Sequence, residues 1–433
     1  MRSRKEMMDM IIEIAEKDVR IRGAYMGGSR TNPNAPRDVF QDYDIVYVVR
    51  ETESFRMDRG WIDVFGRRMY MQYPDDMPGE GAEPENCYGY LMQFADGNRL
   101  DLRLMTLEYA QKDILHDRLC VLLLDKDNML PAIPDATDED HWVKKPGKEE
   151  YLHCCNEFWW ILNSVGKGLW REEVPYVMDM INKYSRPELI KMLSWDVGID
   201  TDFSCSVGKF GKYLKRWLSE DKYDRLVRTY PNADKDAIWQ SVWEMCELFD
   251  ETANRVGKKL GYPYNEMEAH NSRLYLDCTY ALPKDAEVFL MVRRMKAADV
   301  DKTAEIWLEG NLDAHSFIPE EYWRGNYDDV KRQLAGAEAY VYEDCDGLHG
   351  FVGVKDGYIQ GVFVRKEMRS KGIGKALLDF CKGKYTELSL HVYSENKKAL
   401  EFYIREGFQV GKVQSDGNTE QKEYEMIWRK ECE

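Results

Sequence analysis

A glycine turn followed by a strand that begins with two carboxylates places the strongest constraint on this chain. Gly27-Gly28-Ser29 precedes a polar, proline-broken connection, and a run of strand-forming residues then opens with Asp42 and Asp44. Because side chains alternate faces along a strand, these two carboxylates point to the same side. Carboxylates are ligands for magnesium, and a glycine turn lets the backbone approach a phosphate. The segment therefore predicts magnesium-dependent phosphate chemistry.

A second alternating segment supplies a third carboxylate. Between Arg99 and Leu104, leucines alternate strictly with Arg99, Asp101 and Arg103, which is the period of a strand. If this strand pairs beside the Asp42 strand, Asp101 completes a cluster of three carboxylates. The alternative is an exposed strand face on which Asp101 forms an ion pair with Arg99 or Arg103.

Length and charge restrict the class of protein. A chain of 433 residues predicts about three domains. The formal net charge of -17 argues against a nucleic-acid or anionic-membrane surface and is compatible with a small cationic substrate. No uncharged apolar run is long enough to span a bilayer, and the N-terminus lacks the apolar core of a signal peptide. Ten cysteines without zinc or redox spacing are expected to be reduced packing residues, so we expect a cytoplasmic protein.

The order of predicted elements divides the chain. A helix over Met7–Arg20 leads into a strand over Gly23–Met26, and a surface loop is expected over Pro74–Asn86. An acidic, proline-containing connection over Asp125–Lys148 ends the first part. Helical patterns then continue to about Tyr280, and they include Tyr151–Val165, Val174–Tyr184, Arg186–Val197, a basic helix starting in Ser206–Arg216, and Ala237–Leu260.

The last third of the chain returns to strands. Helices are expected over Asp299–Glu309, Gly374–Lys384 and Asn396–Glu406. The strand candidates are Val288–Met295, Ala339–Tyr342, Leu348–Lys355, Tyr358–Val364, Glu387–Val392 and Tyr424–Arg429. The pattern predicts a separate mixed α/β domain.

The first site resembles a known family. Gly28-Ser29, then twelve residues, then Asp42-x-Asp44 and a later Asp101 resemble the nucleotidyltransferase fold of the DNA polymerase beta superfamily. The run Gly28-Ser29-Arg30-Thr31-Asn32-Pro33-Asn34, with the residues from Phe40 to Val46, is similar to the aminoglycoside 6-nucleotidyltransferases, or streptomycin adenylyltransferases. The resemblance extends through the helical part to about Tyr280.

This resemblance implies transfer of AMP from ATP to a hydroxyl of an aminoglycoside such as streptomycin, which confers antibiotic resistance. It implies that Asp42, Asp44 and Asp101 bind Mg²⁺, and Asp101 would alternatively take the proton from the attacking hydroxyl. The implied contacts to ATP are Gly28, Ser29, Arg30, Lys209 and Lys212. For Lys209 and Lys212 a solvated helix face is the alternative.

The C-terminal part carries an independent pattern. The strand over Tyr358–Val364 runs into the basic glycine turn Arg369-Ser370-Lys371-Gly372-Ile373-Gly374-Lys375, after which a helix begins. Such a turn presents N–H groups and the positive end of the helix dipole to a pyrophosphate. With Asn396-x-x-Ala399-x-x-Phe402-Tyr403 and Gly407-Phe408 further on, it resembles the GCN5-related N-acetyltransferases (GNAT).

The GNAT resemblance implies transfer of an acetyl group from acetyl-CoA to an amine. Tyr403 would protonate the departing thiolate, with a half-buried helix aromatic as the alternative. Asn396 would bind the pantetheine arm, and backbone groups of the splayed strand at Val362 and Val364 would bind the thioester. The implied pyrophosphate contacts are Arg369, Lys371, Gly372, Gly374 and Lys375. No general base is identified; His315 and Glu320 lie where such domains shape the acceptor pocket.

We therefore expect a multidomain α+β and α/β protein. Its parts are a polymerase-beta-like nucleotidyltransferase domain over residues 1–134, an all-helical domain over 141–282 that binds substrate and nucleotide, and a GNAT-fold domain over 288–433. The acetyl acceptor stays open between a second aminoglycoside, a protein amine, a polyamine and another metabolite. The rival hypotheses are adenylylation of a macromolecule, and a domain retained as a non-catalytic ligand-binding module.

Overall fold

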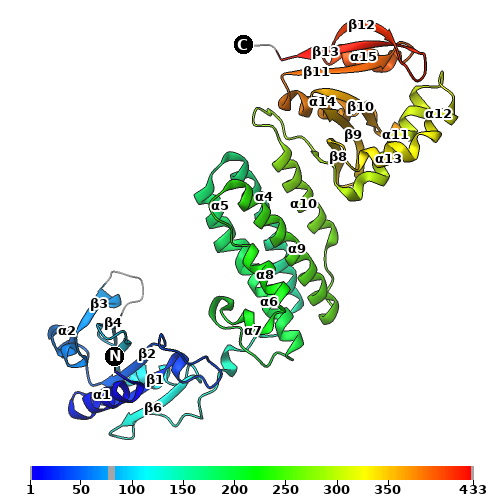
Figure 1. Cartoon of the computed structure of the whole chain (residues 1–433). Helices are drawn as coiled ribbons and strands as arrows, with labels where there is room; N and C mark the ends of the chain where they lie inside the picture. The colour runs from blue at the N-terminus through cyan, green and yellow to red at the C-terminus, as the bar shows by residue number, and fades with distance from the viewer. Residues whose placement is uncertain (1, 77–82, 431–433) are drawn as a thin grey trace. The chain divides into compact units, whose positions relative to one another are not determined.

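The computed structural model describes residues 2–76 and 83–430, which form two compact units (Figure 1). One unit comprises Met1–Lys145 with Val197–Trp217, and the other comprises Pro146–Asp196 with Leu218–Glu433. The loop predicted over Pro74–Asn86 lies partly outside the described residues. None of the described helices is both long enough and apolar enough to cross a membrane. The predicted fold class, a mixed α/β protein with a helical region, is confirmed.

A mixed sheet forms the centre of the first unit. In the described part of this unit the sheet has six strands in the order β3-β4-β5-β2-β1-β6. Strands β2 and β5 run parallel, whereas the other neighbouring strands are antiparallel. The strands are β1 (Ile21–Gly27), β2 (Tyr43–Val49), β3 (Arg68–Gln72), β4 (Cys87–Phe94), β5 (Arg99–Thr106) and β6 (Cys120–Asp125). The expected pairing of the Asp101 strand beside the Asp42 strand is confirmed.

Helices cover both faces of this sheet. Helix α1 (Arg4–Lys17) buries its apolar stripe in a core that includes Ile45, Tyr47 and Val49. Val46 and Val48 point to the other face, where they pack with residues of α3 (Leu107–Asp113). Burial on both faces explains why β2 is a continuous apolar run after its two aspartates. Shorter helices of this unit are η1 (Gly28–Arg30), α2 (Glu53–Met57), η2 (Trp61–Phe65), η3 (Pro74–Asp76) and η4 (Glu139–His141).

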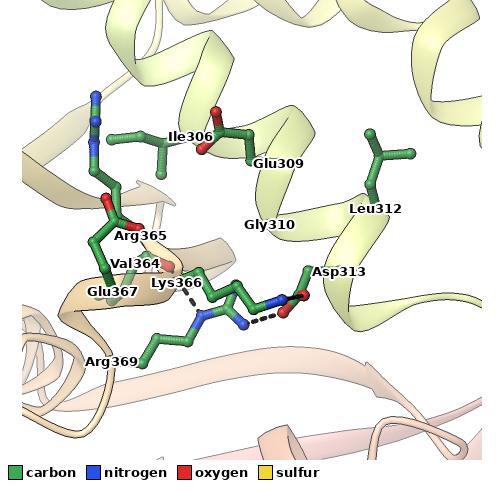
Figure 2. Close-up of a pocket in the computed structure, with 10 residues that line it drawn as sticks. All are labelled: Ile306, Glu309, Gly310, Leu312, Asp313, Val364, Arg365, Lys366, Glu367 and Arg369. Atoms are coloured by element: carbon green, nitrogen blue, oxygen red, sulfur yellow. Dashed lines mark hydrogen bonds and ion pairs between the residues drawn. The ribbon is translucent and has the colours of Figure 1, made fainter.

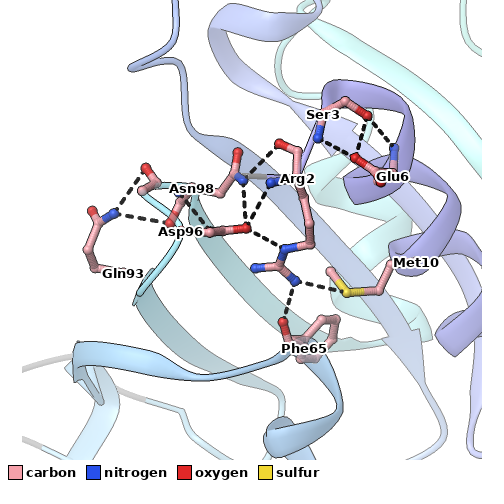
Figure 3. A network of polar contacts seen from close by, with 9 residues as sticks. Arg2, Ser3, Glu6, Met10, Phe65, Gln93, Asp96 and Asn98 are labelled. Carbon is pink, nitrogen blue, oxygen red and sulfur yellow. Dashed lines mark hydrogen bonds and ion pairs between the residues drawn. The ribbon is translucent and has the colours of Figure 1, made fainter.

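A polar network fixes the turn that leads into β5 (Figure 3). The Arg2 guanidinium donates to Asp96 Oδ2 at 2.6 Å and to the Phe65 carbonyl at 2.6 Å. The Asn98 amide donates to the Arg2 carbonyl and to Asp96 Oδ2, both at 3.1 Å. Hydrogen bonding by Arg2 holds the pKa of Asp96 well below its ordinary value. The start of the Asp101 strand is therefore anchored to the N-terminal segment.

The helical region contains long helices with apolar faces. Phe158 of α4 stacks on Phe249 of α9 with ring centroids 3.7 Å apart. Helix α9 is capped at its start by the Asp234 side chain and ends at Gly261, whose φ is 75°. The helices are α4 (Lys148–Arg171), α5 (Val174–Met180), the π-helical turn η5 (Ile181–Ser185), α6 (Arg186–Asp200), α8 (Glu220–Arg228), α9 (Lys235–Leu260) and α10 (Glu266–Ala281).

The prediction of a basic helix that starts in Ser206–Arg216 is wrong. The segment forms a single 3-10 turn, η6 (Lys209–Gly211), followed by the short α7 (Leu214–Trp217). Gly208 has a φ of 69° and Phe210 a φ of 57°, and such left-handed backbone interrupts an α-helix. By its contacts this segment belongs to the first compact unit.

The C-terminal part of the second unit is built on another sheet. Its described residues form seven strands in the order β12-β13-β11-β10-β9-β8-β7. The strands are β7 (Val292–Arg294), β8 (Ala339–Asp344), β9 (Gly347–Lys355), β10 (Tyr358–Val364), β11 (Glu387–Tyr393), β12 (Gln409–Ser415) and β13 (Lys422–Arg429). The helices are η7 (Ala297–Asp299), α11 (Val300–Ala314), α12 (Glu320–Gly325), α13 (Tyr327–Leu334), η8 (Lys366–Met368), α14 (Ile373–Lys384) and α15 (Lys397–Arg405).

Candidate active sites

The two parallel strands of the first sheet place two aspartates side by side. Asp44 of β2 and Asp101 of β5 are direct register partners, and Asp42 immediately precedes β2. Asp44 is also the register partner of Gly27 at the end of β1. The predicted carboxylates and the glycine turn thus meet at one end of three neighbouring strands.

Gly28 is fitted directly against one of these carboxylates. Its φ is 70°, and a Cβ atom at this position would lie 2.0 Å from Asp44 Oδ2. Any side chain would therefore displace the carboxylate, in addition to straining a left-handed backbone. The turn needs glycine because the Asp44 side chain occupies the space above it.

Burial and neighbouring negative charge raise the pKa of Asp44 and of Asp42. Burial, reinforced by the negative charges of Asp101 and Asp42, raises the pKa of Asp44 to about 6. Burial also raises the pKa of Asp42, and the guanidinium of Arg99 opposes that shift. A bound metal cation would favour the charged form of both carboxylates.

Arg30 braces the loop that carries Asp42. Its Nε donates to the Asp42 carbonyl at 2.8 Å and its Nη2 donates to the Gln41 carbonyl at 2.6 Å. Its guanidinium carbon lies 3.7 Å from the ring centre of Tyr43. Gln41 Nε2 in turn donates to the Ser29 carbonyl at 3.3 Å. The structure thus gives Arg30 a positioning role for the Asp42 backbone; its predicted contact with ATP stays a prediction.

Lys209 and Lys212 lie on the exposed η6 segment of the same unit. The positive charge of Lys212 opposes the rise in the pKa of Asp42, so the two residues interact electrostatically. Arg216 donates to the Asn34 carbonyl at 3.3 Å and so links this segment to the loop before Asp42. The structure brings Lys212 toward the carboxylates, and no contact tests the predicted role of either lysine.

The donor set fits a hard divalent cation, although its carboxylates do not converge tightly. Asp42, Asp44 and Asp101 do not bring their ligand atoms within 4.8 Å of one another. Among the described residues, the group of three that meets this distance is Asp344, Cys345 and Asp346, in another part of the chain. Instead, Arg99 donates to both carboxylate oxygens of Asp101, at 2.8 and 2.7 Å. The ion pair considered as an alternative for Asp101 is thus present, within a site that also holds Asp42 and Asp44.

The second sheet opens where the acetyltransferase pattern requires it. Strands β10 and β11 run parallel, and their register pairing joins Tyr358 to Ser389 near the start of β10. A bulge between Ile359 and Gly361 re-aims the rest of β10. Val362 and Val364 lie beyond this bulge, on the diverging part of the strand.

The glycine turn that follows β10 has the predicted backbone. Gly372 has a φ of 86° and caps α14 without a side-chain hydrogen bond, and a Cβ built there would meet open space. A Cβ at Gly374 would lie 3.1 Å from the Phe402 ring, so α14 approaches α15 closely at this point. The N–H groups that begin α14 are thus free of a side-chain cap.

The basic side chains of this turn are paired unequally. Arg369 forms an ion pair with Asp313 and donates to the Val364 carbonyl at 3.1 Å, while Lys366 contacts Asp313 at 2.7 Å (Figure 2). Lys375 pairs with Asp379 at 2.6 Å along α14. Lys371 is exposed and lies 3.4 Å from the Met368 sulfur. Asp313, which the sequence did not single out, lines a pocket of about 470 Å³ with Arg369.

Tyr403 is buried on α15, and burial raises the pKa of its hydroxyl far above the ordinary value. The hydroxyl is protonated at neutral pH with or without this shift, and the raised pKa makes it a weaker proton donor than a free tyrosine. The Tyr403 ring lies in the core of the domain, so it is more deeply buried than the half-buried helix aromatic expected as the alternative.

Asn396 is the N-cap residue of α15, and both polar atoms of its side-chain amide form hydrogen bonds. Its Oδ1 accepts from the Ala399 N–H at 3.2 Å, and its Nδ2 lies 3.1 Å from His315 Nε2. His315 Nδ1 lies 3.0 Å from Asn311 Oδ1, and Asn311 Nδ2 donates to the Trp307 carbonyl at 2.9 Å. This series of hydrogen bonds places the imidazole proton on His315 Nδ1, because His315 Nε2 must accept the hydrogen bond from Asn396 Nδ2.

Burial lowers the pKa of His315 to about 4, which agrees with a neutral imidazole in that network. The histidine is therefore a structural link between α11 and α15 in this structure. Glu320, the other residue singled out for the acceptor pocket, is exposed and pairs with Arg324 at 3.2 Å.

Comparisons with known proteins agree with both family resemblances. The model of the streptomycin adenylyltransferase family matches residues 1–278, and the model of the acetyltransferase (GNAT) domain matches residues 335–410. The aminoglycoside 6-adenylyltransferase of Bacillus subtilis (strain 168) is 38% identical over 269 residues, which are 62% of this chain and 95% of that protein. The enzyme of the same name from Campylobacter jejuni is 40% identical over 264 residues, 61% of this chain and 91% of that protein.

A separate relative is similar to another part of the chain. The peptidyl-lysine N-acetyltransferase YiaC of Escherichia coli (strain K12) is 31% identical over 140 residues, which are 32% of this chain and 96% of that protein. Both matched regions belong to families of enzymes. The chain is a member of the streptomycin adenylyltransferase family that carries a GNAT acetyltransferase domain after the adenylyltransferase region.

Proposed function

We propose that this chain transfers AMP from ATP to a hydroxyl of an aminoglycoside, with the 6-hydroxyl of streptomycin as the acceptor, and separately transfers acetyl groups to an amine. The observation that carries the first activity is the register pairing of Asp44 with Asp101 directly above Gly28. The names of the adenylyltransferase relatives support the drug class. The net charge of -17 suits a cationic substrate.

The first reaction needs positioning and charge neutralisation more than covalent chemistry. Mg²⁺ bound by Asp42, Asp44 and Asp101 would neutralise the triphosphate and favour the attacking alkoxide. The Gly28 turn and Ser29 would hold the phosphates, with Lys209 and Lys212 as further contacts. A new bond forms between the drug oxygen and the α-phosphorus, the bond to the β-phosphate oxygen breaks, and pyrophosphate leaves. In this proposal Asp101 takes the proton of the hydroxyl.

In the second reaction the neutral amine nitrogen bonds to the thioester carbon and the carbon–sulfur bond breaks. The proton that the nitrogen loses would pass to water, because no general base is assigned, and water would later return a proton to Tyr403. Tyr403 would give its proton to the departing thiolate, and Asn396 would contact the pantetheine arm. Backbone groups at Val362 and Val364 would hold the thioester oxygen. The N–H groups after Gly372 would face the pyrophosphate, with Gly374 and the three basic side chains of Arg369, Lys371 and Lys375 around them.

For the acetyl acceptor we favour the ε-amine of a lysine in a protein. The supporting observation is the similarity to a peptidyl-lysine N-acetyltransferase over nearly its whole length. A second aminoglycoside is the other candidate, because it would join two resistance activities in one chain. We also propose a cytoplasmic location, which the free thiols of the described cysteines support.

Pyrophosphate release from ATP tests the first activity. It should require magnesium and streptomycin, and the Asp42→Asn variant should lose it. Release of CoA thiol tests the second activity, with lysine peptides and a panel of aminoglycosides offered side by side and the Tyr403→Phe variant as control. If neither lysine peptides nor aminoglycosides cause release of CoA thiol, both acceptor proposals are refuted. If pyrophosphate is released equally without any aminoglycoside, the proposed drug substrate is refuted.

A further inference from the structure

Arg99 lies between two carboxylates of the first site. As the first residue of β5 it points to the same face as Asp101, two residues further on. Its Nε and Nη2 donate to the two oxygens of Asp101 at 2.8 and 2.7 Å, and its Nη1 lies 3.8 Å from Asp42 Oδ2. One guanidinium thus contacts two of the three carboxylates that lie near the start of β2.

The neighbourhood explains why a cation is needed there. Asp44 stands beside Asp101 in the register of two adjacent strands, so their charges repel each other at close range. Arg103 lies on the same face of β5 and its positive charge acts on Asp44, but the ion pairs of the described residues include none between Arg103 and these aspartates. Arg99 is therefore the side chain that bridges the carboxylates when no other cation is bound.

The Arg99 guanidinium can also move away from the two carboxylates. The Arg99 side chain is 44% exposed, so it can move into solvent without opening the core. Its planar fork of N–H donors suits phosphate oxygens as well as carboxylates. The contacts that Arg99 makes with Asp101 use the same oxygens that a metal ion would need.

We infer that Arg99 is a resident counter-cation: it holds Asp42 and Asp101 together until a divalent cation displaces it, and it then turns to the phosphates of the nucleotide. This inference rests on the proposed function, because it takes the carboxylates as the metal ligands. Arg99 is thus a positioning residue that competes with the metal, and its loss should strengthen metal binding while it weakens catalysis.

Manganese binding to the full chain without nucleotide tests the inference, with free Mn²⁺ measured by electron paramagnetic resonance. Removing one positive charge a few ångströms from the metal should tighten binding of Mn²⁺ by about tenfold in Arg99→Gln. The matched control Arg103→Gln removes the same charge from the same strand face, but Arg103 forms no ion pair with Asp42 or Asp101. Its charge acts on Asp44, so this variant should tighten Mn²⁺ binding by less than Arg99→Gln does. Arg99→Lys, which keeps the charge, should stay within a fewfold of the wild type.

The rate of adenylyl transfer at saturating Mn²⁺ gives the second readout. Arg99→Gln should be slower although it binds the metal more tightly, whereas a residue with only a structural role would weaken both when removed. Circular dichroism establishes that each variant is folded. Unchanged or weaker Mn²⁺ binding by Arg99→Gln would overturn the inference.

The outcomes separate this inference from the proposed function. If Asp42→Asn abolishes Mn²⁺ binding and adenylyl transfer while Arg99→Gln binds like the wild type, the inference fails and the proposed function stands. If the wild type and Arg99→Gln both bind no Mn²⁺, the proposed metal site fails together with the inference.

Discussion

At the scale of single residues, the contact between Gly28 and Asp44 carries the account. Substituting Gly28 by alanine places a Cβ 2.0 Å from Asp44 Oδ2 and strains a φ of 70°. We expect adenylyl transfer to fall by about 100-fold, because displacing a catalytic group by an ångström has effects of that order. The left-handed backbone should lower the free energy of unfolding by about 1 to 2 kcal/mol.

Gly27 offers a matched control for that variant. Its φ is -108°, and a Cβ there would lie 3.7 Å from the Leu119 carbonyl, an ordinary contact. Gly27→Ala should therefore retain activity close to that of the wild type. Steady-state kinetics on both variants decides the matter, and equal losses in the two would contradict the proposed fit of Gly28 against the carboxylate.

The raised pKa of Asp44 predicts how stability depends on pH. Between about pH 4 and the folded-state pKa of about 6, the folded protein binds more protons at Asp44 than the unfolded chain does. The stability linked to this group is present at low pH and is lost as the pH rises through that window. The Tm of Asp44→Asn minus that of the wild type should therefore increase from pH 4 to pH 7.

Asp96 supplies a control of opposite sign. Its pKa is lowered by Arg2, so its contribution to stability is present above the unfolded-state pKa and is lost as the pH falls. Asp96→Asn should lower the Tm at pH 7 and lower it less at pH 3.5, as differential scanning fluorimetry can show. A Tm difference for Asp44→Asn that does not depend on pH would contradict the electrostatic description of the site.

Side-chain alternation in the sequence was enough to predict that Asp42, Asp44 and Asp101 share a face, and the parallel pairing of β2 with β5 agrees. What the sequence left open was the partner of each polar group. Arg99 and Arg103 have the same spacing from Asp101, and a choice between them depends on rotamers and neighbouring strands. The Asp313–Arg369 ion pair joins residues far apart in the chain, so no local sequence pattern predicts it.

At the scale of elements, the start of α15 is coupled to α11 through His315 and Asn396. Replacing the N-cap residue Asn396 by alanine should cost about 1 kcal/mol. Because the two side chains share a hydrogen bond, a double-mutant cycle with His315→Ala should give a coupling of about 0.5 to 1.5 kcal/mol in urea unfolding. Additive effects would show that the link contributes nothing to the position of α15.

The neutral state of His315 extends this prediction to catalysis. Its pKa of about 4 means that it does not titrate between pH 6 and 8. The pH profile of acetyl transfer in that range should therefore keep its shape in His315→Gln, even if the rate falls. A profile that loses an ionisation in this variant would instead make His315 a general base.

Elements with clear apolar periods were predictable, and those without were not. The bounds of β10 agree with the prediction over Tyr358–Val364. In contrast, β12 is exposed along its whole length and has no apolar alternation, so no sequence pattern predicts this strand. The helix prediction for the η6 segment was wrong for another reason, because left-handed backbone at Phe210 interrupts a stretch whose charges suggested a helix.

At the scale of the whole molecule, two families of enzyme are joined in one chain. The adenylyltransferase carboxylates lie in the first compact unit and Tyr403 lies in the second. We therefore expect Asp42→Asn to leave acetyl-CoA binding and thiol release unchanged, and Tyr403→Phe to leave adenylyl transfer unchanged. Parallel assays on the two variants check this, and loss of both activities in either one would contradict independent sites.

The central claim is that the three aspartates transfer AMP to an aminoglycoside. Mass spectrometry of streptomycin after incubation with the full chain, ATP and magnesium tests it most directly, with Asp42→Asn beside it. The account predicts that the drug gains the mass of one adenylyl group with the wild type and gains none with the variant. An unmodified drug with the wild type, or equal modification by both proteins, would contradict it.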